Sequence, residues 1–80
     1  MTIRFRIKAE ADGQCLARII DHFAQEGLIP SSVLANHVGH VLDIVIEHPT
    51  MEIAAGQAMC SRMSRLIMVD TASVQHLPPR

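Results

Sequence analysis

The sequence is poor in aromatic residues: Phe5 and Phe23 are the only two, and both tryptophan and tyrosine are absent. The hydrophobic core must therefore be built mainly from Ile, Leu, Val, Met and Ala, since nearly half of the residues are apolar. Proteins that read single-stranded RNA stack its bases on exposed aromatic rings. Because Phe5 falls on the inward face of a predicted strand, the sequence does not predict an RNA-binding surface.

Charge, long apolar runs and cysteine are also scarce. The formal net charge is −1 with neutral histidines, which gives no overall field to attract nucleic acid or an anionic membrane. No apolar run approaches the roughly 20 residues that span a bilayer, and the first residues do not have the pattern of a signal peptide. The two cysteines, Cys15 and Cys60, lie in predicted helices, which is typical of a reduced, cytoplasmic protein rather than a disulfide framework.

The chain is organised around its first 28 residues. Apolar and basic residues alternate over residues 3–9, which is the period of a half-buried strand. Apolar residues then recur at three- and four-residue steps over residues 16–23, which predicts an amphipathic helix. Asp12 lies in the turn between these elements and can cap the helix, and Gly27 suits a left-handed cap at its other end.

Two strands joined by a tight turn are predicted next. An edge strand is expected at 31–37, because Pro30 lacks the N–H that a central strand would use. Val38-Gly39 is the predicted hairpin turn. The segment 40–48 is the strongest strand in the chain, since it is rich in β-branched residues.

The last part of the chain predicts a second helix at 51–66, capped by Thr50. Gly56 interrupts this helix, and we interpret it as a glycine at a crossing with a neighbouring element. A short strand is expected at 67–70. The polar segment 71–80 is predicted to be a frayed tail.

This element order, β-α-β-β-α-β, predicts an α+β fold and a single domain spanning residues 1–80. Its simplest form is a ferredoxin-like sandwich, in which one four-stranded antiparallel sheet carries two helices on one face. On the open face, basic residues of the central first strand face acidic residues of its neighbours: Arg4, Arg6 and Lys8 against Asp43 and Glu47, with Asp70 nearby. We expect a solvated face there rather than a binding surface.

No arrangement of catalytic side chains is visible in the sequence, so we expect no enzyme and no cofactor. Cys15 lies in a helix's first turn, but a nucleophile would need exposure and a partner base, so we interpret it as a core residue. No Cys-x-x-Cys pair is present. His37, His40 and His48 suggest a small metal site as a weaker alternative, but they lack a nearby carboxylate or thiolate, so no metal is expected.

A binding module remains. The N–H groups at the start of the first helix suit a ligand carboxylate. If two copies join through the second strand, each first turn approaches the partner's edge strand. A ligand at that seam would couple binding to dimer geometry, as a regulatory domain requires.

Segments 14–23 (QCLARIIDHF) and 27–33 (GLIPSSV) resemble the opening of ACT domains. In that family, a turn of the form Asp-x-Pro-Gly-x-Leu-Ala-x-Ile leads the first helix and Gly-[Phe/Val]-Asn-Ile begins the second strand. The resemblance runs from Ile3 to about Thr71 in element order and spacing. Within the family, the chain is most similar to the short regulatory subunits of acetolactate synthase. Those subunits pair through their sheets and bind a large catalytic subunit, and some bind branched-chain amino acids at the dimer seam.

The resemblance implies a ligand seam made of two segments. These are the turn Asp12, Gly13, Gln14 and Cys15, and the strand entry Ile29, Pro30, Ser31 and Ser32. The chain departs from the family there: Gln14 replaces a Gly, Gly13 takes the place of a Pro, and Ile29-Pro30 replaces Asn-Ile. The lost glycine limits how closely a ligand approaches the backbone. The lost asparagine removes a polar anchor.

Two hypotheses follow. The first is an amino-acid-binding regulatory domain, forming a homodimer through sheet edges, or an accessory subunit of an amino-acid biosynthetic enzyme such as acetolactate synthase. The second is an interaction module that has lost its effector site and assembles with itself or a larger enzyme through sheet edges.

Overall fold

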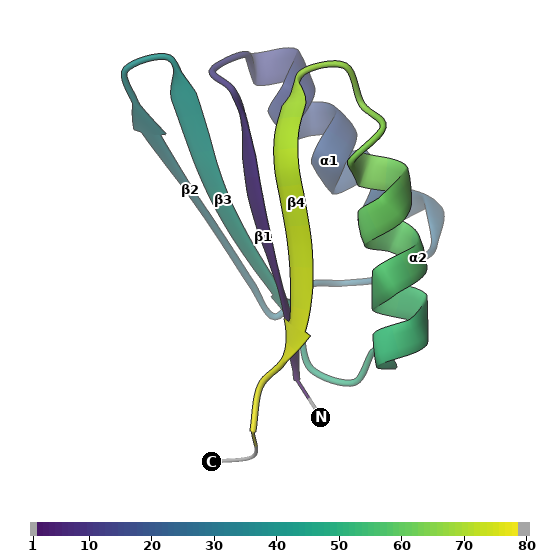
Figure 1. Cartoon of the computed structure of the whole chain (residues 1–80). Coiled ribbons are helices and arrows are strands. Elements are labelled where there is room, and N and C mark those ends of the chain that lie inside the picture. The colour runs from purple at the N-terminus through teal and green to yellow at the C-terminus, as the bar shows by residue number, and fades with distance from the viewer. Residues whose placement is uncertain (1, 79–80) are drawn as a thin grey trace.

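A computed structural model describes residues 2–78 as one four-stranded antiparallel sheet with both helices on the same face (Figure 1). The strand order is β2-β3-β1-β4, which confirms the predicted ferredoxin-like sandwich. The elements are β1 (Ile3–Glu10), α1 (Gly13–Gln25), β2 (Ser32–Val38), β3 (Val41–His48), α2 (Ile53–Met63) and β4 (Val69–His76). Neither helix in this part of the chain has the length and apolar character needed to cross a bilayer.

β1 lies inside the sheet and pairs with β3 on one side and β4 on the other. Its inward-facing Phe5 meets Phe23 of α1 edge to face, with ring centroids 5.3 Å apart. Aliphatic and sulfur-containing side chains complete the core around this pair: Ile3, Ile7, Ile19, Ile44, Ile46, Met59 and Met63 are all nearly inaccessible to solvent. The period-two pattern of β1 and β3 therefore sets which face of the sheet the helices cover.

Both predicted caps of α1 are present. The Asp12 carboxylate accepts a hydrogen bond from the Gln14 N–H at 2.7 Å. At the other end, Gly27 adopts φ +68°, and the N–H groups of Gly27 and Leu28 donate to the carbonyls of Ala24 and Phe23. This pair of bonds is a Schellman motif, in which glycine avoids the strain that a side chain would meet.

Gly56 marks the place where α2 crosses the sheet. A Cβ atom at this position would lie 2.6 Å from Cδ1 of Ile3 and 3.3 Å from Cγ2 of Val74. The missing side chain therefore lets α2 approach β1 and β4 closely, which agrees with the sequence interpretation of a glycine at a helix crossing.

The hairpin turn differs by one residue from the prediction. Val38 pairs with Val41, so the two-residue loop is Gly39-His40 rather than Val38-Gly39. Gly39 has φ +60°, and no non-glycine residue in the described chain has a positive φ. Glycine at the first loop position corresponds to a type II′ turn, whose twist matches that of the flanking strands.

The start of α2 also differs from the prediction. The helix begins at Ile53, not Met51, and Thr50 does not cap it; the cap position is Glu52, whose side chain makes no capping bond. Instead Nδ1 of the buried His48 accepts hydrogen bonds from the N–H groups of Met51 at 3.0 Å and Thr50 at 3.3 Å. The histidine thus organises the turn between β3 and α2.

The prediction of a frayed tail is wrong for residues 71–76. These residues continue β4, which pairs with β1 on the side opposite β3. Ala72 and Val74 point inward and are half-buried, whereas Thr71, Ser73 and Gln75 face solvent. The alternation of apolar and polar residues is weak because the inward residues are few and small. The polar outward residues therefore dominate the segment in the sequence. The last predicted tail residues, 79–80, lie outside the described part of the chain.

Candidate functional site

The turn between β1 and α1 is held by its neighbours on both sides. The Glu10 N–H donates to the carbonyl of Met68 at 2.9 Å, and the Ala11 N–H donates to that of His40 at 3.0 Å. Figure 1 shows the turn at the same end of the molecule as the β2–β3 hairpin and the connection from α2 to β4. These hydrogen bonds fix the backbone of the turn at this end of the sheet.

Asp12 accepts hydrogen bonds from the backbone N–H groups at the start of α1. Its carboxylate takes the Gln14 N–H, and its carbonyl accepts from Cys15 N–H at 3.1 Å and Leu16 N–H at 3.3 Å. The N–H groups of Gln14 and Cys15, which lack a partner within the helix, are thus engaged by Asp12, and that of Leu16 makes the first regular helical bond. The carboxylate also adds negative charge where a ligand carboxylate was expected, so the turn suits a ligand ammonium or another donor better.

The other turn residues differ in accessibility. Gly13 and Gln14 are exposed, and a Cβ placed on Gly13 would meet no atom within 4 Å. Cys15 is only 1% exposed and belongs to the core. Burial raises the pKa of the Cys15 thiol, and the carboxylates of Asp12 and Glu10 raise it further against an opposing effect of Arg18. Its thiol is therefore neither accessible nor activated as a nucleophile.

The predicted strand entry is mostly open to solvent. Ile29 is 83% exposed, Pro30 is half-buried and Ser32 is exposed on the open sheet face. Ser31 is tied to the end of β3, because its N–H and hydroxyl both donate to the carbonyl of Glu47, at 2.8 and 3.2 Å. Ile29 and Ser32 are thus the residues of this segment most available to a partner or ligand.

A single chain does not bring the two predicted segments together. The turn lies at the start of α1, and the strand entry follows its end, at the opposite end of the molecule (Figure 1). A 13-residue helix separates them, which is roughly 20 Å of rise. The eight predicted residues can form one site only across two copies.

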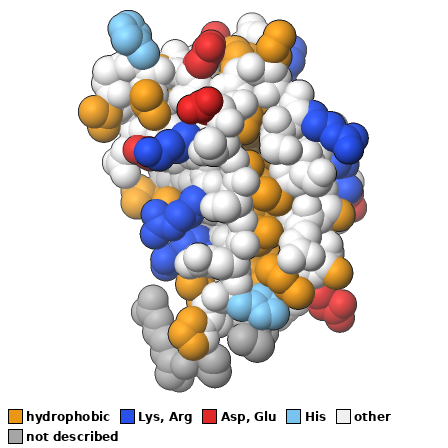
Figure 2. All heavy atoms as spheres, in the orientation of Figure 1, with side chains coloured by type: hydrophobic (Ala, Val, Ile, Leu, Met, Phe, Trp, Pro, Cys, Tyr) orange, Lys and Arg blue, Asp and Glu red, His pale blue; other side chains and the backbone are white. Residues whose placement is uncertain are grey.

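The edge strand β2 concentrates exposed apolar side chains, and hydrophobic side chains lie at the surface around the β2–β3 hairpin in Figure 2. Seven large hydrophobic residues are exposed in the described chain, and five of them lie on β2 or next to it: Ile29, Val33, Leu34, Val38 and Val41. Every residue of β2 is exposed. Ile20, on α1, is a sixth. The sequence predicted the edge position but not this apolar surface, which depends on how far the helices reach over the sheet.

The histidines do not converge on a metal site. The His37 ring is bonded to the Gly39 carbonyl at 2.8 Å, and Nδ1 of His48 already accepts two backbone N–H groups. Within residues 2–78, no three His, Cys, Asp or Glu side chains are grouped closely enough to hold a metal ion. The metal hypothesis therefore gains no support from the geometry.

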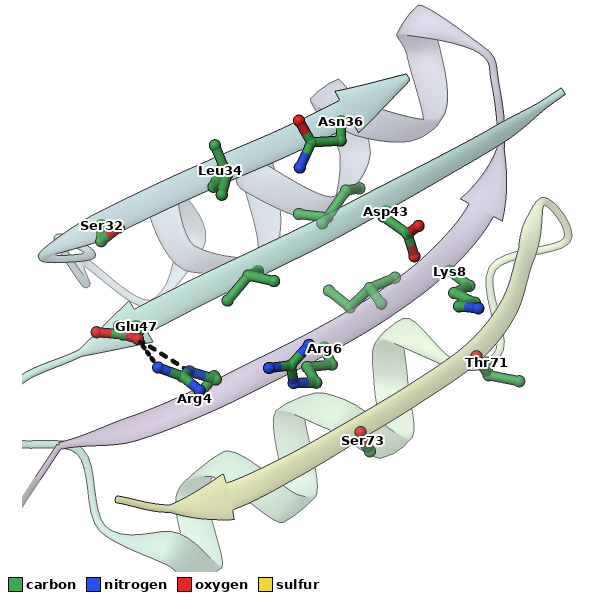
Figure 3. Close-up of a pocket in the computed structure, with 13 residues that line it drawn as sticks. Arg4, Arg6, Lys8, Ser32, Leu34, Asn36, Asp43, Glu47, Thr71 and Ser73 are labelled. Carbon is green, nitrogen blue, oxygen red and sulfur yellow. Dashed lines mark hydrogen bonds and ion pairs between the residues drawn. The ribbon is translucent and has the colours of Figure 1, made fainter. Parts of the chain in front are cut away.

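A hollow on the open face of the sheet lies away from the predicted turn but reaches the predicted strand entry at Ser32. It encloses about 830 Å³ and is lined by side chains from all four strands (Figure 3). Among the basic and acidic residues predicted to face one another there, Arg4 forms an ion pair with Glu47, with nitrogen–oxygen distances of 2.9 and 2.7 Å. Lys8 lies opposite Asp43 in the register without an ion pair. Sequence reasoning gave this face no binding role.

Comparison with known proteins identifies the fold. A family model described as an ACT-like domain matches residues 1–80. The ACT domain from GTP pyrophosphokinase of Chlorobium tepidum is similar both as a crystal structure (TM-score 0.80, 9% identity, covering 94% of this chain and 97% of that one) and in solution (TM-score 0.81, 9% identity, 98% and 89%). The C-terminal domain of the MgtC protein from Mycobacterium tuberculosis has a TM-score of 0.72 at 9% identity, covering 92% and 84%. No curated protein matches in sequence.

Proposed function

Because this chain belongs to the ACT-like domain family, we propose that it is a regulatory module without catalytic activity that binds an amino acid between two copies of itself. In this proposal, the copies join along β2, and the ligand occupies the seam. The module would act in the cytoplasm, on its own or as an accessory subunit of a larger amino-acid biosynthetic enzyme such as acetolactate synthase.

The observation that carries the proposal is the apolar, unpaired edge at β2. An exposed edge strand offers free N–H and C=O groups to another strand, and proteins usually guard it with lysine, proline or a bulge. The segment Ser32–Val38 contains neither lysine nor proline, and it pairs with β3 without a register shift. Val33 on the helix side and Leu34 on the open side are 44% and 55% exposed. A second β2 would cover both the edge and these side chains.

Two-fold symmetry supplies the rest of the seam. An isologous pair has antiparallel β2 strands, so the start of one β2 lies beside the end of the other. The turn at Asp12–Gln14 lies at the end of the molecule where β2 finishes (Figure 1). The pairing would therefore bring this turn towards Ile29–Ser32 of the second copy.

The chemistry of the turn favours a ligand with a hydrogen-bond donor or a positive group. Asp12 keeps one carboxylate oxygen free of intramolecular bonds, and the exposed Gln14 offers an amide. An amino acid carries an ammonium group for Asp12 and a carboxylate for the Gln14 amide. The apolar Ile29 of the second copy would contact an aliphatic side chain.

The oligomeric state tests the dimer. Sedimentation should give a dimer for the natural protein and a monomer for Val33→Lys, because the new lysine of each copy would be buried in the contact between the two β2 strands. Ile67→Lys is the matched control, since Ile67 is 91% exposed outside β2. A monomeric natural protein, or equal loss of the dimer in both variants, would contradict the proposal.

A thermal-shift screen against the common amino acids tests the ligand. A bound amino acid should raise the melting temperature by mass action, and Gln14→Gly should reduce the shift, because it removes the amide that would bind the ligand carboxylate. A response lost in Val33→Lys but kept in Ile67→Lys would locate binding at the seam. An unchanged melting temperature with every amino acid would count against the sensor.

One observation favours the second candidate, an interaction module without an effector site. Asp12 accepts hydrogen bonds from two of the free N–H groups at the start of α1, those of Gln14 and Cys15, and fewer donors remain for a ligand carboxylate. Under this alternative, the β2 edge would still assemble the protein with itself or with a larger enzyme, while the thermal-shift screen would be negative.

A further inference from the structure

The open face of the sheet is charged unevenly. Among residues 2–78, Arg4 is the only cation on this face with an ion pair, the one that it makes with Glu47. Arg6 lies opposite Val45 on β3, so no carboxylate faces it across either strand pair. The predicted opposition of basic and acidic residues on this face is therefore incomplete, because neither residue directly opposite Arg6 is acidic.

The neighbours of Arg6 on β4 are hydrogen-bond donors. In the register, Arg6 lies opposite Ser73 and Lys8 lies opposite Thr71. Figure 3 shows Lys8 extending towards Thr71, with Ser73 on the strand beside Arg6. Directly opposed residues have Cβ atoms about 5 Å apart, and residues two apart on one strand face are separated by about 7 Å, so two cations and two hydroxyls lie around one patch of the open face. The carboxylates of Asp43 and Glu47 flank this area on the β3 side only.

We propose that Arg6, Lys8, Thr71 and Ser73 form a binding site for a phosphate group carried by a small molecule. A guanidinium binds phosphate with two parallel bonds, and lysine adds a point charge. A phosphate monoester offers three acceptor oxygens, which match the donors of the two hydroxyls and the two cations. The hollow of about 830 Å³ above these residues has room for the organic part of such a molecule.

This site is separate from the proposed amino-acid seam. Pairing along β2 extends the sheet sideways and leaves its open face uncovered, so the phosphate site needs no second copy. Failure of either proposal therefore leaves the other intact. A monomer that still binds phosphate, or a dimer that does not, would separate them.

Titration of the full chain with inorganic phosphate and with glycerol 3-phosphate, followed by NMR of the backbone amides, tests the site. Saturable shifts should be confined to the neighbourhood of residues 6, 8, 71 and 73. Arg6→Gln should weaken binding about tenfold or more, as expected for loss of a charge-assisted bidentate contact. Ser73→Ala should weaken it by a smaller factor.

Arg65→Gln is the matched control, because Arg65 is also exposed and has no ion pair among residues 2–78. It should change the dissociation constant less than twofold. Tighter binding of glycerol 3-phosphate than of phosphate would identify an ester site, and equal binding would identify a site for the phosphate group alone; both support the proposal. Shifts that never saturate, an equal effect of Arg65→Gln, or equal binding of acetate would overturn it. The amide spectrum of Arg6→Gln verifies its fold.

Discussion

At the scale of single residues, two glycines of the helices should respond in opposite ways to the same substitution. Gly13→Ala should raise the free energy of unfolding by about 0.5 kcal/mol, because the new methyl group meets no neighbour and the unfolded chain loses freedom. Gly56→Ala should lower it by about 1 kcal/mol, because Ile3, which has no exposed surface, must move to admit the methyl group. Urea denaturation measures both; equal signs would show that the crossing at Gly56 is not tight.

His48 is a residue whose structural task was not visible in the sequence. His48→Ala should destabilise the fold by about 2 kcal/mol, since two backbone N–H groups lose their acceptor in a buried turn. His48→Asn should recover much of this loss, because an asparagine oxygen also accepts from backbone N–H groups two and three residues ahead. The comparison is made by urea unfolding of the two variants. If asparagine is no better than alanine, packing rather than hydrogen bonding explains the histidine.

The two cysteines should make stability depend on pH in the alkaline range. Burial raises the pKa of both thiols, with a further contribution from Asp12 and Glu10 at Cys15. Free thiols of the unfolded chain ionise above about pH 8.5, whereas the folded thiols keep their protons to higher pH. Between these values the unfolded state binds fewer protons, so the free energy of unfolding falls as pH rises.

Urea midpoints between about pH 7 and about pH 10 measure this slope. A variant with both Cys15→Ala and Cys60→Ala should be less stable at neutral pH, because it leaves cavities, but its stability should vary less with pH. The same slope in both proteins would show that other groups cause it.

At the scale of elements, the sequence predicted those with a strong period and missed the limits of those without one. The alternation over residues 3–9 and the caps at Asp12 and Gly27 are local signals, and the structure confirms them. The end of β4 depends instead on pairing with β1, which lies more than 60 residues earlier in the chain, so the local sequence does not reveal it. The same limit applies to the candidate site: each segment could be named, but their separation in one chain follows from the topology.

The extent of β4 can be tested by truncation. A chain that ends after Asp70 should lose cooperative unfolding, because β1 would lack one of its two partners and Val74 would no longer cover the core below Gly56. A chain that ends after Pro78 keeps the whole strand and should unfold as the full chain does. Circular dichroism during urea titration compares the two. Cooperative unfolding of the shorter chain would restore the prediction of a frayed tail.

At the scale of the whole molecule, the small size of the chain and its exposed apolar edge both favour association with a partner. A chain of 80 residues buries only about 60–65% of its unfolded surface, and here five of the seven exposed large apolar residues lie on or beside one edge of the sheet. Under the proposed dimer, folding and association are linked, so the melting temperature should depend on protein concentration. Each tenfold increase in concentration should raise it by about 4 °C for a dimer of this size.

Val33→Lys should remove this concentration dependence and lower the melting temperature at high concentration, while Ile67→Lys should keep both close to those of the natural protein. Scanning calorimetry over a roughly hundredfold range of protein concentration compares the three proteins. A melting temperature independent of concentration in the natural protein would mean that β2 is stable as a free edge. A different partner would then cover its apolar side chains. Under the second candidate function, that partner is a larger enzyme subunit.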